Sequence, residues 1–187
     1  RDTKGWEAKE QKNWAKAIEK GTEGCAPWNN LKPRVIPMWK DYGLKEYVST
    51  EVRKGVTHDT LVCRLPYDAQ VTPWLQVQAN AGDTIKMETD NFVVANGMQE
   101  YESLGWISGN EMYYIYPKTV KIKKVQYRET GYDAEFAGSF SSNDAFMNRF
   151  WEKAVRTLYV NMRDTYFDCP DRERAQWWGD EVYLGSQ

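Results

Sequence analysis

The sequence predicts a mixed, β-rich fold in which an antiparallel β-sandwich is followed by the opening helices of a second, helical domain. Two observations carry this prediction. Between about residues 51 and 137, apolar and polar side chains alternate in short runs separated by turn residues, as is typical of strands. After residue 138, apolar side chains recur about every fourth position, as is typical of an amphipathic helix.

Residues 1–50 are predicted to form an N-terminal helix and an extended linker. Between residues 6 and 20, apolar side chains keep helical spacing, and Gly21 can end that helix. The stretch that follows is interrupted by three prolines, Pro27, Pro33 and Pro37. Proline fixes its own backbone and lacks an amide donor, so this stretch is expected to be extended.

Residues 51–137 are predicted to form the β-sandwich. One face of a strand is formed by Leu75, Val77 and Ala79, and the intervening residues form the other face. An Ala-Gly-Asp turn and a second alternating run at Ile85 and Met87 then predict a hairpin. Two more strands are expected in the stretches EMYYIY and VKIKKVQY, the second of which carries a lysine pair, Lys123-Lys124, that fits a bulge or a sheet edge.

Residues 138–187 are predicted to open the helical domain. Ser141 or Ser142 can cap the helix, with Asp144 placed to close a capping box with Ser141. The apolar stripe consists of Phe146, Phe150, Ala154, Leu158 and Met162, widened by Trp151 and Val155. A face this wide needs helical neighbours, so we expect it to contact a missing remainder of the domain or to cause self-association.

Charge and composition exclude several classes of function. The 25 basic and 27 acidic residues give a net charge of −2 without a basic stripe, which argues against a nucleic-acid partner. No apolar run is long enough to span a bilayer, and the first residues are charged where a secretory signal becomes apolar. We therefore expect no membrane partner, and the sequence does not itself indicate a compartment.

Metal and disulfide sites are also not expected. Cys25, Cys63 and Cys169 are odd in number and widely spaced, and His58 is the single histidine in the sequence. These residues form neither a disulfide framework nor a set of zinc ligands. We accordingly expect no metal and no cofactor.

The stretch DCPDRERAQWWGD, residues 168–180, concentrates acids, arginines and tryptophans. Pro170 interrupts any helix that enters it, so most of the stretch is expected to be a loop, with a new helix starting at Gly179 and capped by Asp180. Such residues suit acid-base chemistry at a glycosidic bond, which needs one protonated carboxyl and one carboxylate. For each acid taken singly, a solvated charged turn with ordinary caps and ion pairs is the favoured explanation. For the segment as a whole, spacing alone leaves the choice open.

Aromatic content gives weak additional support for a sugar-handling protein. The chain has 9 Trp, 12 Tyr and 6 Phe, and a flat ring can pack on the C–H face of a sugar while polar neighbours bond its hydroxyls. Filling of the core is the favoured explanation for most of the tryptophans.

The segment DCPDRERAQWWGD resembles the signature of the inverting bacterial α-L-rhamnosidases, a family whose catalytic domain is an α/α toroid of six helical hairpins. Upstream, YRETGYDAEFAGSFSSND resembles the passage from the family's last β-sandwich into the first toroid helix, and LPYDAQVTPWLQV resembles a strand of that sandwich. The resemblance covers about residues 60–187. It implies that residues 138–187 are the truncated start of the toroid.

The resemblance also implies roles for individual residues. The family's general acid falls on Glu173, and its sugar-contacting residues fall on Asp168, Arg172 and Asp180. Its aromatic wall falls on Trp177. Many members have glycine at the position of Gln176 and a small or hydroxyl residue at the position of Trp178. At these two positions the resemblance therefore does not determine the pocket shape or the sugar specificity.

The resemblance implies a fragment of a glycoside hydrolase that removes terminal α-L-rhamnose by inversion. Its general base would lie outside this chain, so the 187 residues alone are expected to be inactive. The implied partner is a rhamnosylated glycan or glycoside, and a periplasmic or extracellular location is favoured for such a bacterial enzyme. Two alternatives stay open: a non-catalytic glycan-binding sandwich acting through Trp74 or Trp106, and a toroid hydrolase for a different sugar.

Overall fold

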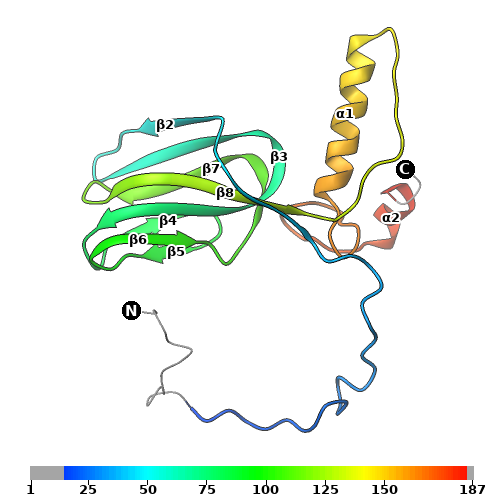
Figure 1. The fold of residues 1–187 in the computed structure, drawn as a ribbon, viewed down its shortest axis with the longest axis horizontal. Helices are drawn as coiled ribbons and strands as arrows, with labels where there is room; N and C mark the ends of the chain where they lie inside the picture. The colour runs from blue at the N-terminus through cyan, green and yellow to red at the C-terminus, as the bar shows by residue number, and fades with distance from the viewer. Residues whose placement is uncertain (1–14, 185–187) are drawn as a thin grey trace. The chain divides into compact units, whose positions relative to one another are not determined.

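A computed structural model describes residues 15–184 (Figure 1), and the chain divides into two compact units, Arg1–Pro37 and Met38–Gln187. In the first unit, residues 15–37 contain bends and turns but neither a helix nor a strand. The helix predicted between residues 6 and 20 is therefore wrong for residues 15–20. Its remaining part lies outside the described residues.

The described part of the second unit contains a β-rich region followed by two helices. The strands are β1 Lys40–Lys45, β2 Ser49–Arg53, β3 His58–Ala79, β4 Thr84–Lys86, β5 Asn91–Val93, β6 Gly97–Glu102, β7 Ile107–Pro117 and β8 Lys121–Gly131. The helices are α1 Ala145–Val160 and α2 Trp178–Leu184. Because strands begin at residue 40, the extended linker predicted to run to residue 50 is shorter than expected.

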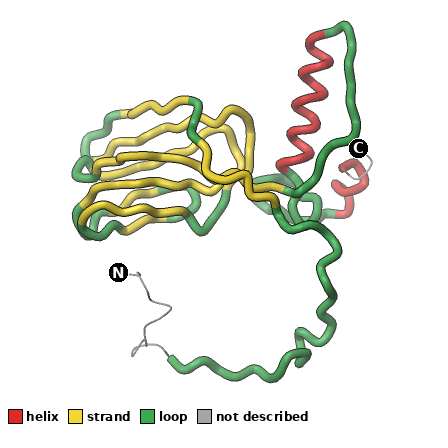
Figure 2. The backbone as a smooth tube through the Cα atoms, in the orientation of Figure 1, coloured by secondary structure: helices red, strands yellow, loops and turns green. Residues whose placement is uncertain are grey.

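The strands form one curled antiparallel sheet in the order β1-β8-β3-β7-β4-β5, with β2 and β6 also paired to β3. The long strand β3 explains the curl (Figure 2). Its first part pairs with β2 and β7, and its last part pairs with β6 and β8. The register with β7 shifts between Arg64 and Ala69, as expected where a strand bends. The predicted sandwich is thus hydrogen-bonded as a single sheet, because one strand continues from one side of it to the other.

The core lies inside this curl and follows the alternation of the sequence. Leu75, Val77 and Ala79 are buried, as predicted, and pack with the rest of the hydrophobic cluster of the sheet. Gln76 pairs with Lys124 and Val77 with Ile122, so the ladder skips one residue at the lysine pair. The predicted bulge is confirmed.

The predicted hairpin is wrong. The end of β3 pairs with β6 and β8, whereas β4 pairs with β5 and β7. The chain after β3 instead closes a loop in which Gly82 N donates to Val94 O and Val94 N donates to Asp83 O. Alternation predicts which face of a strand is buried, but it does not predict the neighbouring strand.

Helix α1 begins two or three residues later than the predicted serine cap requires, because its N-cap is Asp144 and not Ser142 or Ser141. Asp144 is its N-cap and accepts a 2.8 Å hydrogen bond from Phe146 N. Ser142 accepts from Asp144 N and donates to Asn148 Oδ1, so it supports the cap from outside the helix. The predicted serine cap is corrected to Asp144, whose carboxylate reaches a free amide of the first turn.

Buried and polar contacts hold the C-terminal end of α1 on the sheet. Arg156 donates to Glu129 Oε1 at 3.1 Å and also to the Asp68 carbonyl. Gln70 Nε2 donates to Val160 O at 2.5 Å, and Tyr159 Oη donates to Tyr132 O at 2.8 Å.

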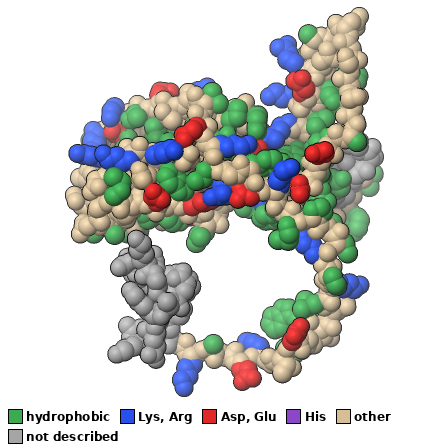
Figure 3. All heavy atoms as spheres, viewed as in Figure 1, with side chains coloured by type: hydrophobic (Ala, Val, Ile, Leu, Met, Phe, Trp, Pro, Cys, Tyr) green, Lys and Arg blue, Asp and Glu red, His purple; other side chains and the backbone are tan. Residues whose placement is uncertain are grey.

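The other end of α1 leaves its apolar side chains open. Phe146 and Phe150 are 65% and 60% exposed although their rings stack on each other, so this part of the predicted apolar stripe stays largely open to solvent. On the face in view, basic and acidic side chains are interspersed over the sheet (Figure 3).

The described residues include no helix long and apolar enough to cross a membrane. Two helices do not define a toroid, and that part of the fold stays a prediction.

Candidate functional site

Four of the five predicted site residues, Asp168, Arg172, Glu173 and Trp177, lie on the loop between α1 and α2. Asp168 closes this loop at its neck. Asp168 N donates to Ala175 O, and Ala175 N donates to Asp168 Oδ1, each at 3.0 Å. Inside the loop, Glu173 N donates to Cys169 Sγ at 3.2 Å. The loop is therefore a small closed structure and not an extended connection. The expectation that most of this segment is loop is confirmed.

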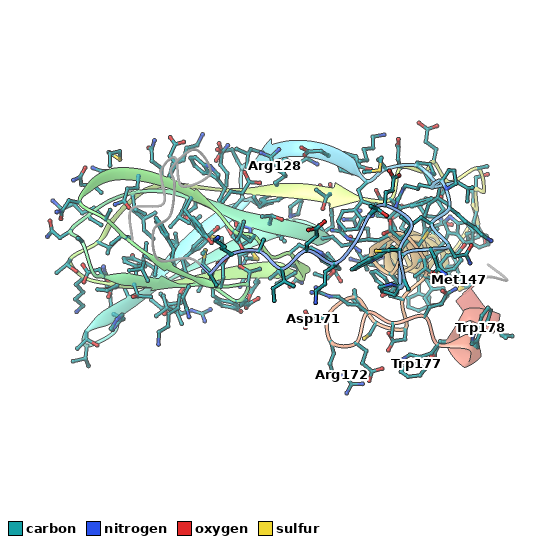
Figure 4. The ribbon with its side chains drawn as sticks, turned by 90° about the horizontal axis from the view of Figure 1, so that it is seen from below. Arg128, Met147, Asp171, Arg172, Trp177 and Trp178 are labelled. Atoms are coloured by element: carbon teal, nitrogen blue, oxygen red, sulfur yellow. The ribbon has the colours of Figure 1, made fainter. Side chains whose placement is uncertain are left out.

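The Glu173 carboxylate is the point at which three predicted residues meet. Arg172 Nη2 donates to Glu173 Oε1 at 2.5 Å, and Trp177 Nε1 donates to Glu173 Oε2 at 2.7 Å. The Glu173 side chain is 38% exposed, and that of Arg172 is 81% exposed. Figure 4 shows Arg172 and Trp177 projecting to the same side of the loop. A carboxyl group held by two donors at a solvent-accessible edge is suited to meet a polar substrate.

The Asp168 carboxyl is kept acidic by its surroundings. Desolvation acts to raise its pKa, but hydrogen bonds from Ala175 N and from the side chain and backbone of Cys169 outweigh this effect and lower the pKa. At neutral pH Asp168 is therefore an anion. One of its oxygens closes the neck of the loop.

Asp180 stands apart from this group. Helix α2 begins at Trp178, so the predicted start at Gly179 with Asp180 as its cap is wrong, and Asp180 lies in the first turn of the helix. Its amide donates to Trp177 O at 3.0 Å. Asp180 is exposed, and in residues 15–184 its side chain makes no hydrogen bond to the other predicted site residues.

Sequence reasoning missed the residues that attach this loop to the sheet. Arg174 donates from Nη2 to Trp106 O at 3.1 Å, and its guanidinium carbon lies 3.7 Å from the centre of the Trp106 ring. Arg163 lies over the same ring at 3.9 Å. Because Trp106 precedes Arg163 by 57 positions, no local pattern indicates the contact between these two side chains.

A hollow of about 430 Å³ lies elsewhere, between α1 and the segment before it, with Phe136, Trp151 and Arg156 among its lining residues. A second, of about 530 Å³, lies by the β7–β8 turn. Neither is lined by any of the five predicted site residues. The candidate site in residues 15–184 is thus an open edge and not an enclosed cavity.

Rhamnosidases are among the known proteins that this chain resembles in sequence and fold. Residues 135–185 match the model of the bacterial alpha-L-rhamnosidase 6 hairpin glycosidase domain. A search of curated proteins found no match. The structure resembles a GH78 family rhamnosidase of Bacillus sp. GL1, with a TM-score of 0.64, 22% identity, and 73% of this chain and 17% of that chain covered.

It also resembles a rhamnosidase from Klebsiella oxytoca with rhamnose bound. There the TM-score is 0.67 at 9% identity, with 80% of this chain and 40% of that chain covered. At such identities the likeness shows a shared fold, and this chain spans only a minor part of the length of either protein. Together, the sequence match over residues 135–185 and the shared fold relate this chain to the bacterial α-L-rhamnosidase family.

Proposed function

We propose that this chain carries the acid half of the active site of an inverting α-L-rhamnosidase-like glycoside hydrolase. The observation that carries the proposal is the convergence of Arg172 and Trp177 on the Glu173 carboxylate. That group lies inside the segment matched to the rhamnosidase catalytic domain. The proposed substrate is a glycan or glycoside with a terminal α-L-rhamnose, in keeping with the rhamnose-bound neighbour.

In the proposed reaction, Glu173 gives a proton to the glycosidic oxygen as its bond to the sugar breaks. A leaving group that departs as an alcohol instead of an alkoxide lowers the barrier, and general acids typically contribute about 10²- to 10⁴-fold. Glu173 is exposed enough to meet this oxygen directly.

The remaining residues are proposed to hold the sugar. The Arg172 side chain is 81% exposed, so sugar binding can turn its guanidinium from Glu173 to the hydroxyl groups. Asp168 and Asp180 are proposed to accept hydrogen bonds from hydroxyls, and Trp177 to pack against the apolar face of the ring. Withdrawal of Arg172 would leave Glu173 in position to carry the proton that the reaction needs.

The general base is proposed to lie in a further part of the same protein. Inversion needs a second carboxylate roughly 6.5–9.5 Å from the acid, with water between the two. This chain covers 17% and 40% of the two solved rhamnosidases, which leaves ample room for such a residue. We propose accordingly that residues 51–137 form an accessory domain, that residues 138–187 open the catalytic domain, and that the chain alone is inactive.

Replacement of Glu173 tests the acid assignment. In the full-length protein that carries this sequence, Glu173→Gln should lower kcat on phenyl α-L-rhamnoside by about 10²-fold or more. On 2,4-dinitrophenyl α-L-rhamnoside the loss should be much smaller, because dinitrophenolate leaves without a proton. Glu135→Gln, which changes an exposed glutamate between β8 and α1, serves as the matched control. Unchanged hydrolysis of the phenyl substrate by Glu173→Gln would exclude the role.

A hydrolase for a different sugar is the second candidate. It is favoured by Gln176 and by Trp178, which adds a ring where many members of the family have a small residue. Trp178 is 81% exposed and follows directly on the loop that carries Glu173, residues 168–177, here called the acid loop. A panel of aryl glycosides given to the full-length protein separates the two cases. Glycan binding by the sheet through Trp106 is less well supported, because two guanidinium groups lie over that ring.

A further inference from the structure

The residue that follows Glu173 has an unusual backbone conformation. Arg174 has a φ of 50°, in the left-handed region that side chains with a Cβ rarely adopt. Its side chain is held at several points: Nε donates to Pro170 O at 3.1 Å, Nη2 donates to Trp106 O at 3.1 Å, and Asp171 lies 3.5 Å away. Such a conformation persists only where its surroundings over-determine it, and it is found mostly at functional sites.

A second arginine extends this contact into the core. Arg163 is only 2% exposed, and its guanidinium carbon lies 4.0 Å from the Trp39 ring centre and 3.9 Å from that of Trp106. We name Trp39, Arg163, Trp106 and Arg174 the Trp–Arg stack. The stack joins the residue before β1, the turn after α1, the residue before β7 and the acid loop.

Hydrogen bonds compensate only a small part of the cost of burying the Arg163 charge. Nη2 donates to Thr130 Oγ1 at 2.8 Å, whereas within residues 15–184 Nε and Nη1 have no hydrogen-bond partner. Burial, followed by the nearby Arg174 charge, lowers the pKa of Arg163 to about 10, so it remains a cation at neutral pH. Besides this bond and the opposite charge of Asp164, its partners are the two aromatic faces at about 4 Å. A cation–ring interaction of this kind is strongest where water is excluded.

We propose that Trp106 and Arg174 are positioning residues that set the place of the Glu173 carboxyl from the β-sheet. This inference rests on the proposed function of Glu173 as an acid. Glu173 and Arg174 share a peptide bond. The contacts that hold the Arg174 side chain against Trp106, here called the clamp, therefore fix where the Glu173 backbone lies. A displacement of about 1 Å at such a distance from the chemistry is enough to cost about 10²-fold in rate.

Two acidic side chains, one in the β-region and one on the acid loop, also interact with each other. Burial raises the pKa of Glu88, in the turn between β4 and β5, and the charge of Asp171 raises it further. The acid loop is thus close to the sheet at a second point besides Trp106. Through the contact between Trp106 and Arg174, the β-region affects the position of the acid without touching the substrate itself.

The test compares two substrates in the full-length protein that carries this sequence. Trp106→Leu removes the ring but keeps the carbonyl that accepts from Arg174, and Arg174→Lys keeps the charge but loses the planar group. Each should lower kcat on phenyl α-L-rhamnoside by about tenfold to a hundredfold with KM nearly unchanged. On the dinitrophenyl substrate, the change should stay below about threefold, because only proton donation by Glu173 is displaced.

Conservative and distant variants make this result specific. Trp106→Phe keeps an aromatic face and should recover most of the lost rate. Tyr113→Leu, at a half-buried aromatic residue of β7, and Arg64→Lys, at an ion pair with Glu111, should leave both substrates unaffected. Equal losses on both substrates would indicate reduced folding and overturn the positioning role, as would full activity of Trp106→Leu.

A wild-type protein that hydrolyses neither rhamnoside would refute the proposed function, and the clamp is then judged by hydrogen exchange. Peptides that cover residues 168–176 should exchange at least about tenfold faster in Trp106→Leu than in wild type, whereas peptides from β7 should not change. Unchanged protection of residues 168–176 in Trp106→Leu would refute the clamp by itself.

Discussion

Gly131 lies so close to the Tyr159 ring that a methyl group added at Gly131 should weaken the attachment of α1 to the sheet. A Cβ at Gly131 would lie 2.8 and 2.9 Å from two carbons of the Tyr159 ring and would also contact its hydroxyl oxygen. Tyr159 has little freedom to move, because it is only 8% exposed and its hydroxyl bonds to Tyr132 O and Tyr42 Oη. Overpacking costs about 1–3 kcal/mol and each lost hydrogen bond about 1 kcal/mol, so Gly131→Ala should lower the free energy of unfolding by about 2–4 kcal/mol.

Urea unfolding followed by tryptophan fluorescence and far-UV circular dichroism measures this change. Gly138→Ala is the matched control, because its Cβ would meet Trp151 at 3.9 Å, an ordinary contact, and should change stability by less than about 0.5 kcal/mol. In a Tyr159→Leu background the penalty of Gly131→Ala should largely disappear. A Gly131→Ala chain as stable as wild type would refute the reasoning, and a penalty that persists without Tyr159 would show that the contact is not its cause.

Two further predictions concern ionisable groups in the sheet. The hydrogen bond from Lys54 lowers the pKa of Asp59 below its ordinary value of 3.8, so its stabilising effect is present above about pH 4 and is lost as pH falls further. Urea unfolding at pH 6 and pH 3 should therefore show a smaller decline for Asp59→Asn than for wild type, and equal declines would contradict this. Cys63 is fully buried, and burial raises its thiol pKa to about 12, so iodoacetamide at pH 8 should label it only after unfolding. Peptide mass spectrometry measures the label, and rapid labelling of the native chain would count against the packing.

Local pattern predicted the elements better than their arrangement. Side-chain alternation in β3 indicated its buried face, the lysine pair indicated the bulge in β8, and a four-residue period indicated α1. Each of these features depends on a few neighbouring residues. The pairing of β3 with β6, β7 and β8 was not predicted, because an alternating strand fits any neighbour with a complementary face.

The candidate site shows the same division. The residues around Glu173 lie within a few positions of one another, so a single segment of sequence indicated the group that Arg172 and Trp177 complete. The stretch from Asp168 to Asp180 was enough to propose an acid and its neighbours. It was not enough to show that the Asp168 carboxylate closes the loop and that Asp180 stands apart.

By itself, then, the sequence determined a β-rich chain, an amphipathic helix and a charged loop with a resemblance to rhamnosidases, because periodicity and short motifs are local properties. Only the tertiary structure decided that a bent β3 curls the strands into one sheet, and that Trp106 of this sheet lies under the arginine next to Glu173. These contacts join residues far apart in the chain. They form where the Trp106 ring packs against two guanidinium groups, and no local pattern encodes that packing.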